Sequence, residues 1–202
     1  MISSFKALHQ LVKGATPKRV ALVAAEDPIL IQAATRAQQE GLARFILFGD
    51  SRKIESLIPP GATRFEIVDS QNPAVDAIKY IHADKADLLM KGKIQTGDLL
   101  RAILDREMGL RQGELLNHIA VIESPHYHKL LFISDGGINL HLDEHVYQQM
   151  VVNITQYLKL LGIKRPHFGM MTLVETVSEK IPETIIAQKV VEALSKTVSI
   201  EG

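Results

Sequence analysis

The sequence has 202 residues, of which 46% are hydrophobic, with 23 basic residues, 23 acidic residues and no cysteine. This balance is typical of a folded protein and disfavours a nucleic-acid surface, because binding a phosphate backbone needs a basic excess. Without cysteine, disulfides, cysteine nucleophiles and thiolate metal sites are excluded. The N-terminus lacks a signal-peptide pattern, and no run of about 20 apolar residues could span a membrane. We therefore expect a soluble, cytoplasmic protein that binds neither nucleic acid nor membrane.

The first half of the chain alternates predicted helices and strands. A helix with an apolar face begins near Phe5, and a later helix begins at Asp27-Pro28, where Asp27 is the predicted N-cap. Several strand–helix units in series favour a doubly wound, mostly parallel sheet, in which ligands bind beyond the carboxyl ends of the strands. The strands are predicted at 19–25, 44–49, 64–68 and 86–91, and the later helices at 28–41, 52–57, 73–82 and 96–107.

The second half differs in character. Two apolar runs at 118–123 and 129–134, joined by a turn-like segment, predict an antiparallel pair. Because residues 111–114 are polar, we expect two domains, 1–116 and 117–202. The chain ends soon after a strand begins at residue 197, so we expect the C-terminal part of the second domain to be absent. The other predicted elements are a helix at 144–161, a strand at 167–173 and a helix at 182–194.

The most informative segment runs from residue 86 to residue 101. An apolar run ends in Lys91-Gly92, and Thr96 then begins an amphipathic helix that contains Arg101. The first N–H groups of a helix lack partners and attract anions, and nearby cations strengthen this attraction. Glycine also permits a ligand to come close to the backbone. The segment therefore predicts a site for a phosphorylated or carboxylated ligand.

Each of these residues also has a structural explanation. Thr96 can be an ordinary helix N-cap, and Arg101 can be a solvated charge on the helix surface. We expect Lys91 at the end of a buried strand, where its amine reaches either a cleft or bulk solvent.

Polar residues in the second half give a further candidate. Asp135, followed by two glycines, and Asn139 form a predicted loop after a strand, where they either bind a ligand or close a turn. His118 begins the preceding strand, either as a packed or surface histidine or as a residue near the cleft. The pairs His126/His128 and His141/His145 lack the His-Glu-x-x-His pattern, and we predict no metal site. Motifs for P-loop nucleotide binding, dinucleotide binding and the hydrolase elbow are absent.

Several segments, taken in order, resemble the phosphate butyryltransferase branch of the phosphate acetyl/butyryltransferase family. The resemblance covers about residues 19 to 200 and depends on the order and spacing of the segments rather than on one motif. The segments are 89–92 with Thr96, 100–105, 117–125, 129–135 with Asn139, 161–163 with Pro166, 174–175 and 181–184.

The resemblance implies two α/β/α domains of isocitrate dehydrogenase-like architecture with the active site in the cleft between them. It implies the reaction acyl-CoA + phosphate ⇌ acyl phosphate + CoA, in which coenzyme A is a substrate and no cofactor is bound. By position, Thr96 and Arg101 would hold phosphate groups, and Lys91 with Gly92 would line the cleft. Asp135 and Asn139 would line it from the second domain, and we add His118 to these substrate-binding candidates.

Two departures from the family pattern matter. Relatives carry Asp-Ala-Ala-Met-Asn where this chain has Asp135-Gly136-Gly137-Ile138-Asn139. The part of the family pattern expected after Gly202, with a Ser-Arg pair and an acidic residue linked to CoA binding and thiol activation, is missing, so the catalytic residues stay unassigned. An incomplete sheet leaves open edges, and we expect a homodimer. The alternatives are a non-catalytic anion- or CoA-binding or oligomerising module, and an oxidoreductase of the isocitrate dehydrogenase-like type.

Overall fold

The computed structural model describes residues 2–62, 64–196 and 199–201. The chain separates into two compact units. The first unit comprises Lys6–Gln112, and the second comprises the described residues of 1–5 and 113–202.

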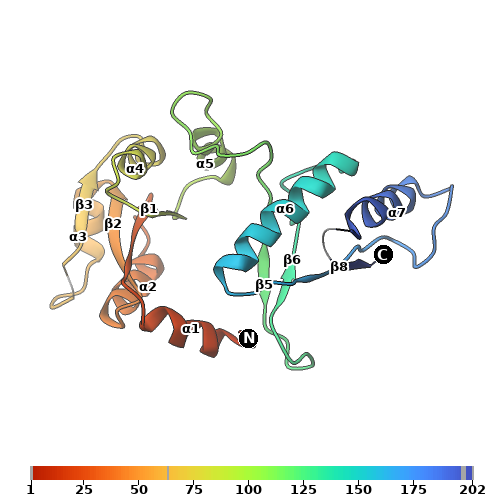
Figure 1. The fold of residues 1–202 in the computed structure, drawn as a ribbon. Helices are drawn as coiled ribbons and strands as arrows, with labels where there is room; N and C mark the ends of the chain where they lie inside the picture. The colour runs from red at the N-terminus through yellow and green to blue at the C-terminus, as the bar shows by residue number, and fades with distance from the viewer. Residues whose placement is uncertain (1, 63, 197–198, 202) are drawn as a thin grey trace. The chain divides into compact units, whose positions relative to one another are not determined.

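The first unit contains a parallel sheet of four strands in the order β3-β2-β1-β4 (Figure 1). All three pairings within this sheet are parallel, which confirms the predicted sheet type. The strand positions also agree with the prediction, although the two outer strands are shorter than expected. The strands are β1 (Lys18–Val23), β2 (Ala43–Gly49), β3 (Glu66–Asp69) and β4 (Leu88–Lys91).

In the described part of this unit, three helices connect successive strands, one helix precedes the first strand and one follows the last. At the start of α2, the Asp27 carboxylate accepts hydrogen bonds from the N–H groups of Ile29 and Leu30 at 2.8 and 3.2 Å, so the predicted cap is confirmed. Asn72 occupies the N-cap position of α4, but its side chain makes no capping hydrogen bond. The helices are α1 (Phe5–Lys13), which begins in the second unit, and α2 (Pro28–Gln39), α3 (Ser51–Leu57), α4 (Pro73–His82) and α5 (Thr96–Ile103).

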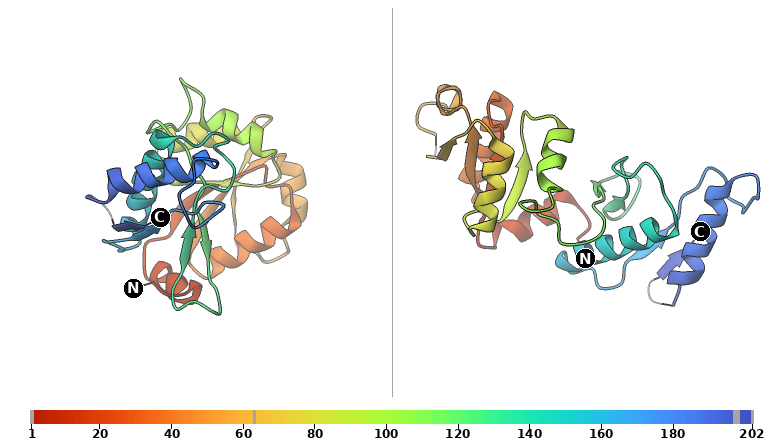
Figure 2. Two further views of the ribbon diagram at one scale, coloured as in Figure 1. Left: turned by 90° about the vertical axis from the view of Figure 1, so that its right-hand side faces the viewer. Right: turned by 90° about the horizontal axis from the view of Figure 1, so that it is seen from above.

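Helices cover both faces of the sheet, which makes it doubly wound (Figures 1 and 2). On one face, Ile31 of α2 and Ile54 of α3 pack with Leu22 and other strand residues. On the opposite face, α4 and α5 contribute Ala77 and Leu99 to a second cluster. Because β1 and β2 are buried on both sides, their sequences are continuous apolar runs rather than alternating ones.

Strand β4 is less buried than β1 and β2. It forms one edge of the sheet, and Leu88 and Met90 are 52% and 36% exposed. The expectation that Lys91 ends a buried strand is therefore wrong. An edge strand has a neighbour on one side only, and in this structure β4 is covered less completely than β1 and β2.

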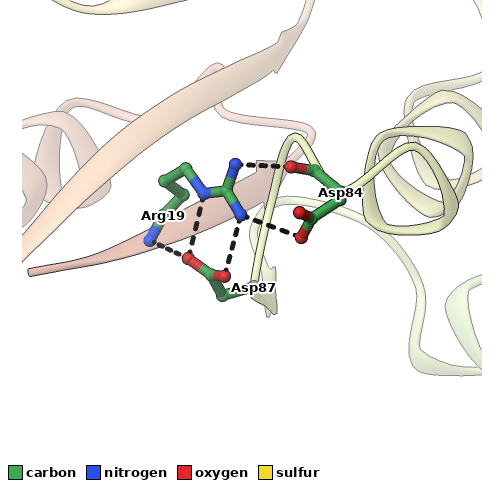
Figure 3. A network of polar contacts seen from close by, with 3 residues as sticks. All are labelled: Arg19, Asp84 and Asp87. Carbon is green, nitrogen blue, oxygen red and sulfur yellow. Dashed lines mark hydrogen bonds and ion pairs between the residues drawn. The ribbon is translucent and has the colours of Figure 1, made fainter.

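An ion-pair network fixes the amino ends of β1 and β4 (Figure 3). The guanidinium of Arg19 donates to both carboxylate oxygens of Asp87 at 3.1 and 2.9 Å, and it also donates to Asp84. The N–H of Arg19 donates to Asp87 as well, at 2.7 Å. These hydrogen bonds hold the pKa of Asp87 far below its usual range. The network lies at the end of the sheet opposite to the carboxyl ends of the strands.

The second unit contains shorter strands. Strands β5 (Ala120–Ile122) and β6 (Leu131–Ile133) are antiparallel, as predicted, and β7 (His167–Gly169) pairs in parallel with β8 (Ser199–Glu201). Strand β7 is shorter than predicted, and residues 197–198 of the predicted last strand lie outside the described residues. The predicted helices are present as α6 (Glu144–Leu160) and α7 (Pro182–Leu194).

The core of the second unit lies around its two helices. Met150 and Leu158 of α6 and Val190 of α7 are buried, whereas Met171 and Leu173, after β7, are 84% and 85% exposed. Within the described residues of the whole chain, no helix combines the length and the apolar character needed to cross a membrane.

Candidate functional site

The carboxyl ends of β1 and β4 form the topological switch point of the sheet. These strands are neighbours, but β1 leads into α2 on one face whereas β4 leads into α5 on the other. In open α/β sheets, ligands bind where neighbouring strands lead to helices on opposite faces in this way. The predicted anion-binding segment lies here.

Gly92 brings the backbone after β4 close to the end of β1. The N–H groups of Gly92 and Lys93 donate to the carbonyl oxygens of Val23 and Ala24 at 2.8 and 2.7 Å. A Cβ atom on Gly92 would lie 2.3 and 2.4 Å from these same two oxygens, too close for any other residue. Ala24 itself has a φ of 55°, which is uncommon for a residue with a side chain. The glycine is therefore required for this backbone approach.

Carboxylates occupy the carboxyl ends of β1, β2 and β3. Asp27 caps α2, Asp50 caps α3 by accepting from Lys53 N–H at 3.1 Å, and Asp69 accepts from Ser51 N–H at 2.9 Å. The backbone N–H of Lys53 holds the pKa of Asp50 below its usual value. Glu26 accepts from the N–H of Asp50 at 2.7 Å. The N-termini of α2 and α3 are thus already occupied by negative charge.

The N-terminus of α5 is different. Gln95, rather than the expected Thr96, occupies the N-cap position, and its side chain caps no N–H group. Thr96 is the first helical residue and is exposed. The exposed side chains of Lys91 and Lys93 flank the preceding loop, and Lys91 Nζ lies 3.4 Å from the carbonyl oxygen of Gly92. The first turn of α5 contains one carboxylate, Asp98, which is paired with Arg101. An N-terminus without a side-chain cap, preceded by two lysines, is an arrangement that favours an anion.

Arg101 lies in the last turn of α5, away from Thr96 in the first turn. Its guanidinium donates to Asp98 at 2.9 Å, and this pair is exposed on both sides. Arg101 and Asp98 also line an open groove of about 720 Å³ between α4 and α5, whose wall includes apolar residues such as Ile78 and Ile94. The structure therefore does not bring Thr96 and Arg101 together, although both lie on one short helix.

In the second unit, two of the predicted residues, His118 and Asn139, hydrogen-bond to the carboxylate of a third, Asp135. Asp135 follows β6, and its two oxygens accept hydrogen bonds from the N–H of His118 at 2.8 Å and the N–H of Asn139 at 2.7 Å. The side-chain amide of Asn139 donates to the same carboxylate at 2.8 Å and to the carbonyl of Leu116 at 3.0 Å. The imidazole of His118 lies against Gly136, where a Cβ atom would be 2.5 Å from Nδ1.

The electrostatics of Asp135 follow from these contacts. Partial burial tends to raise the pKa of this carboxyl, but the N–H groups of His118 and Asn139 outweigh that effect and lower it. Asp135 is therefore a carboxylate at neutral pH, and it organises the loop that follows β6.

Sequence reasoning missed the residues that support this loop. Asn153 of α6 donates to the carbonyl of Leu115 at 3.0 Å and to the side-chain oxygen of Asn117 at 2.7 Å. The amide of Asn117 donates in turn to the hydroxyl oxygen of Ser134 at 2.9 Å. The available signal was a polar residue three positions after Met150, on the apolar face of an amphipathic helix.

The histidine pairs noted in the sequence raise the question of a larger cluster of potential metal ligands. Among the described residues, no group of three histidine, aspartate or glutamate side chains lies close enough to hold a metal ion. His145 instead lies 3.1 Å from the carboxylate of Glu114.

The chain is similar to several known proteins. No family model matches it. It is 33% identical over 193 residues to phosphate butyryltransferase of Clostridium acetobutylicum, a match that covers 93% of this chain and 64% of the relative. It is 34% identical over 174 residues to a probable phosphate butyryltransferase of Bacillus subtilis, covering 84% of this chain and 58% of the relative. The chain thus spans less than two thirds of the length of either protein.

A solved structure agrees with these relatives. The crystal structure of a branched-chain phosphotransacylase from Enterococcus faecalis superposes with a TM-score of 0.76 over 92% of this chain and 67% of the other, at 21% identity. At that identity the likeness establishes the fold. The resemblance recognised in the sequence is thereby confirmed: over 93% of its length the chain is similar to a phosphate butyryltransferase, and it shares the fold of the phosphotransacylase.

Proposed function

We propose that this chain takes part in the transfer of a short acyl group between coenzyme A and inorganic phosphate. The observation that carries the proposal is the similarity to phosphate butyryltransferase along 93% of the chain. The uncapped N-terminus of α5 at the switch point supports it independently, since phosphate, acyl phosphate and the CoA phosphates are all anions. Because the chain spans only 64% of that relative, the activity of the whole relative enters here as a proposal.

In this function, the segment between β4 and α5 binds a phosphate group. The first N–H groups of α5 and the hydroxyl of Thr96 donate to the phosphate oxygens, and Lys91 contributes positive charge. Gly92 lets the chain pass close to β1. Arg101 exchanges its partner Asp98 for a substrate phosphate, and this exchange is easy because the pair is exposed.

In the second unit, His118, Asp135 and Asn139 contribute to substrate binding. Asp135 fixes the backbone of both other residues, which leaves the His118 ring to contact substrate. We also propose that the two units represent the two α/β domains, divided near residue 116, and that the protein is a cytoplasmic homodimer.

The chemistry is an acyl exchange. The sulfur of CoA attacks the carbonyl carbon of the acyl phosphate, a C–S bond forms, the C–O bond to phosphate breaks, and phosphate leaves with the electron pair. The thiol proton must be removed by a base, and no residue of this chain is assigned to that step. The residues named above bind and orient the anionic groups, which reduces the entropic cost of bringing the reactants together.

The test is phosphate-dependent release of the CoA thiol from butyryl-CoA, measured colorimetrically together with the intact mass of the purified protein. We expect Arg101→Ala to raise the KM for phosphate or CoA about tenfold, as loss of one charge-assisted hydrogen bond would. The matched control is Arg36→Ala, because Arg36 forms a similar exposed pair with Glu40 on α2.

An unchanged KM in the Arg101 variant would remove Arg101 from the site. Absence of thiol release with any short-chain acyl-CoA, in a protein that still binds phosphate or CoA by calorimetry, would favour the non-catalytic binding module instead. Loss of all ligand binding would count against both functions.

A further inference from the structure

Asn153 lies in an unusual place for an amide side chain. It lies on α6, where Met150 and Val151 precede it and Leu158 follows it in the sequence. These three apolar neighbours are buried. Asn153 is itself partly buried. A polar group in such a place is costly unless its hydrogen bonds are satisfied.

The hydrogen bonds of Asn153 have a fixed direction. The carbonyl of Leu115 can only accept, so the NH₂ group of Asn153 must face it, at 3.0 Å. The second hydrogen of that NH₂ group then donates to the oxygen of Asn117, at 2.7 Å. This in turn directs the NH₂ group of Asn117 toward the hydroxyl oxygen of Ser134, at 2.9 Å. The chain of donors therefore runs from α6 to the end of β6.

The middle and last members of this chain, Asn117 and Ser134, adjoin the candidate substrate residues. Asn117 precedes His118, and Ser134 precedes Asp135, so one amide chain holds the two segments whose next residues hydrogen-bond to each other. Asn139 closes the same arrangement from the other side by donating to the carbonyl of Leu116. Without Asn153, the 115–118 segment would lose its two hydrogen bonds to α6.

We propose that Asn153 is a positioning residue, which acts through Asn117 and Ser134 to hold His118, Asp135 and Asn139 in the arrangement that binds substrate. The link to substrate binding rests on the proposed function, whereas the positioning of the three residues does not depend on it. The hydrogen bonds of Asn153 go to Leu115 and Asn117 rather than to any of these three residues. Its effect is therefore transmitted through the side chains of Asn117 and Ser134.

The first test measures amide hydrogen exchange by NMR in the full chain. We expect Asn153→Leu to accelerate exchange at the N–H groups of His118 and Asn139, which donate to Asp135, by about tenfold or more. The matched control is Gln156→Leu, one turn further along α6 and exposed. Unchanged exchange at both amides in a folded Asn153→Leu protein would overturn the proposal.

Two further variants guard against simple unfolding. Asn153→Asp keeps the size of the side chain but turns acceptors toward the Leu115 carbonyl, so it should accelerate the same amides. Asn117→Asp should preserve slow exchange, because its carboxylate still accepts from Asn153 and the Ser134 hydroxyl can rotate to donate to it. A general packing role would not distinguish these two substitutions, and equal effects of both would overturn the directed chain.

Binding separates this inference from the proposed function. We expect Asn153→Leu to weaken CoA binding, measured by calorimetry, or to raise KM, by about tenfold, while the control Gln156→Leu stays within about twofold of the unsubstituted protein. Accelerated exchange with unchanged affinity and KM would overturn the link to substrate and leave the acyltransferase proposal intact. If the unsubstituted protein neither binds CoA nor turns over, the proposed function fails, and the exchange rates alone decide whether Asn153 holds the loop.

Discussion

The two units of this chain position their candidate residues by different physical means. In the first unit, β1 and β2 are six and seven residues long, and most of their residues are buried between helices on both faces. In the second unit, β5 and β6 have three residues each, and none of these is fully buried. Around Asp135, hydrogen bonds from backbone and amide groups take the place of that packing.

This difference indicates which kind of substitution would disrupt each site. The segment between β4 and α5 depends on a close-packed sheet, which tolerates changes in volume poorly but needs few polar contacts. The Asp135 loop depends on a polar network, which fails when one partner is removed because the remaining groups are left unsatisfied. Four predictions test the comparison, from the largest expected effect to the smallest.

The largest effect should come from Phe48 in the first unit. Its ring is fully buried and packs edge-on against Tyr80 at 5.0 Å. We expect Phe48→Ala to lower the free energy of unfolding by about 3–5 kcal/mol, measured from urea unfolding. The matched substitution is Phe132→Ala in the second unit, where a half-buried ring meets Tyr157 at 6.3 Å, and about 1–2 kcal/mol is expected. Equal losses would break the comparison.

Asp135→Asn tests the polar network of the second unit. The substituted amide keeps only one oxygen for the N–H groups of His118 and Asn139, so we expect a loss of about 1–3 kcal/mol at pH 7. Because the folded state lowers the pKa of Asp135, its contribution exists above the unfolded pKa of about 3.9 and disappears as the pH falls through the lower folded value. The difference between the two proteins should therefore shrink below pH 4, and a constant difference would contradict the assignment.

Gly92→Ala tests the close backbone approach at the switch point. A methyl group would meet the carbonyl oxygens of Val23 and Ala24, and we expect a loss of about 1–3 kcal/mol. Gly97→Ala is the control, since a Cβ atom at Gly97 has nothing within 4 Å and alanine suits a helix better. Thermal unfolding of both variants should give opposite signs, and a neutral Gly92 variant would show that the backbone relaxes easily.

The smallest effect should come from the exposed network at the amino ends of β1 and β4. We expect Asp87→Asn to lower the melting temperature at pH 7, because Asp87 loses its pairing with Arg19. The folded state depresses the pKa of Asp87, so its contribution is present above about pH 4 and is lost toward more acidic pH. Asp84→Asn should have less effect, since the Asp84 side chain is 95% exposed. A larger effect from Asp84 would reverse this ranking.

Much of the fold could be predicted from local patterns. The continuous apolar runs of β1 and β2 predicted buried parallel strands, and Asp27-Pro28 predicted the start of α2. Two predictions about β4 and α5 were wrong in detail. Lys91 ends an exposed edge strand, and Thr96 follows the cap rather than forming it. The exposure of Lys91 could not be predicted locally, because it depends on the order of strands in the sheet.

The candidate site was predictable in part for the same reason. The loop from Asp135 to Asn139 was found because aspartate, glycine and asparagine have strong local preferences. Its supporting residue Asn153 lies 18 residues after Asp135 on another element, and only the packing of α6 brings it to Asn117. The roles of Lys91, Gly92, Thr96, Arg101, His118, Asp135 and Asn139 in binding stay predictions.

By itself, the sequence determined the alternation of strands and helices, the parallel sheet and the resemblance to the phosphate acyltransferases, because hydrophobic period, capping residues and motif order are properties of neighbouring residues. The tertiary structure decided that β4 lies at a sheet edge, that no side chain caps the N-terminus of α5 and which amides support Asp135. These features depend on contacts between residues distant in the chain, and their energies are settled only when the elements pack together.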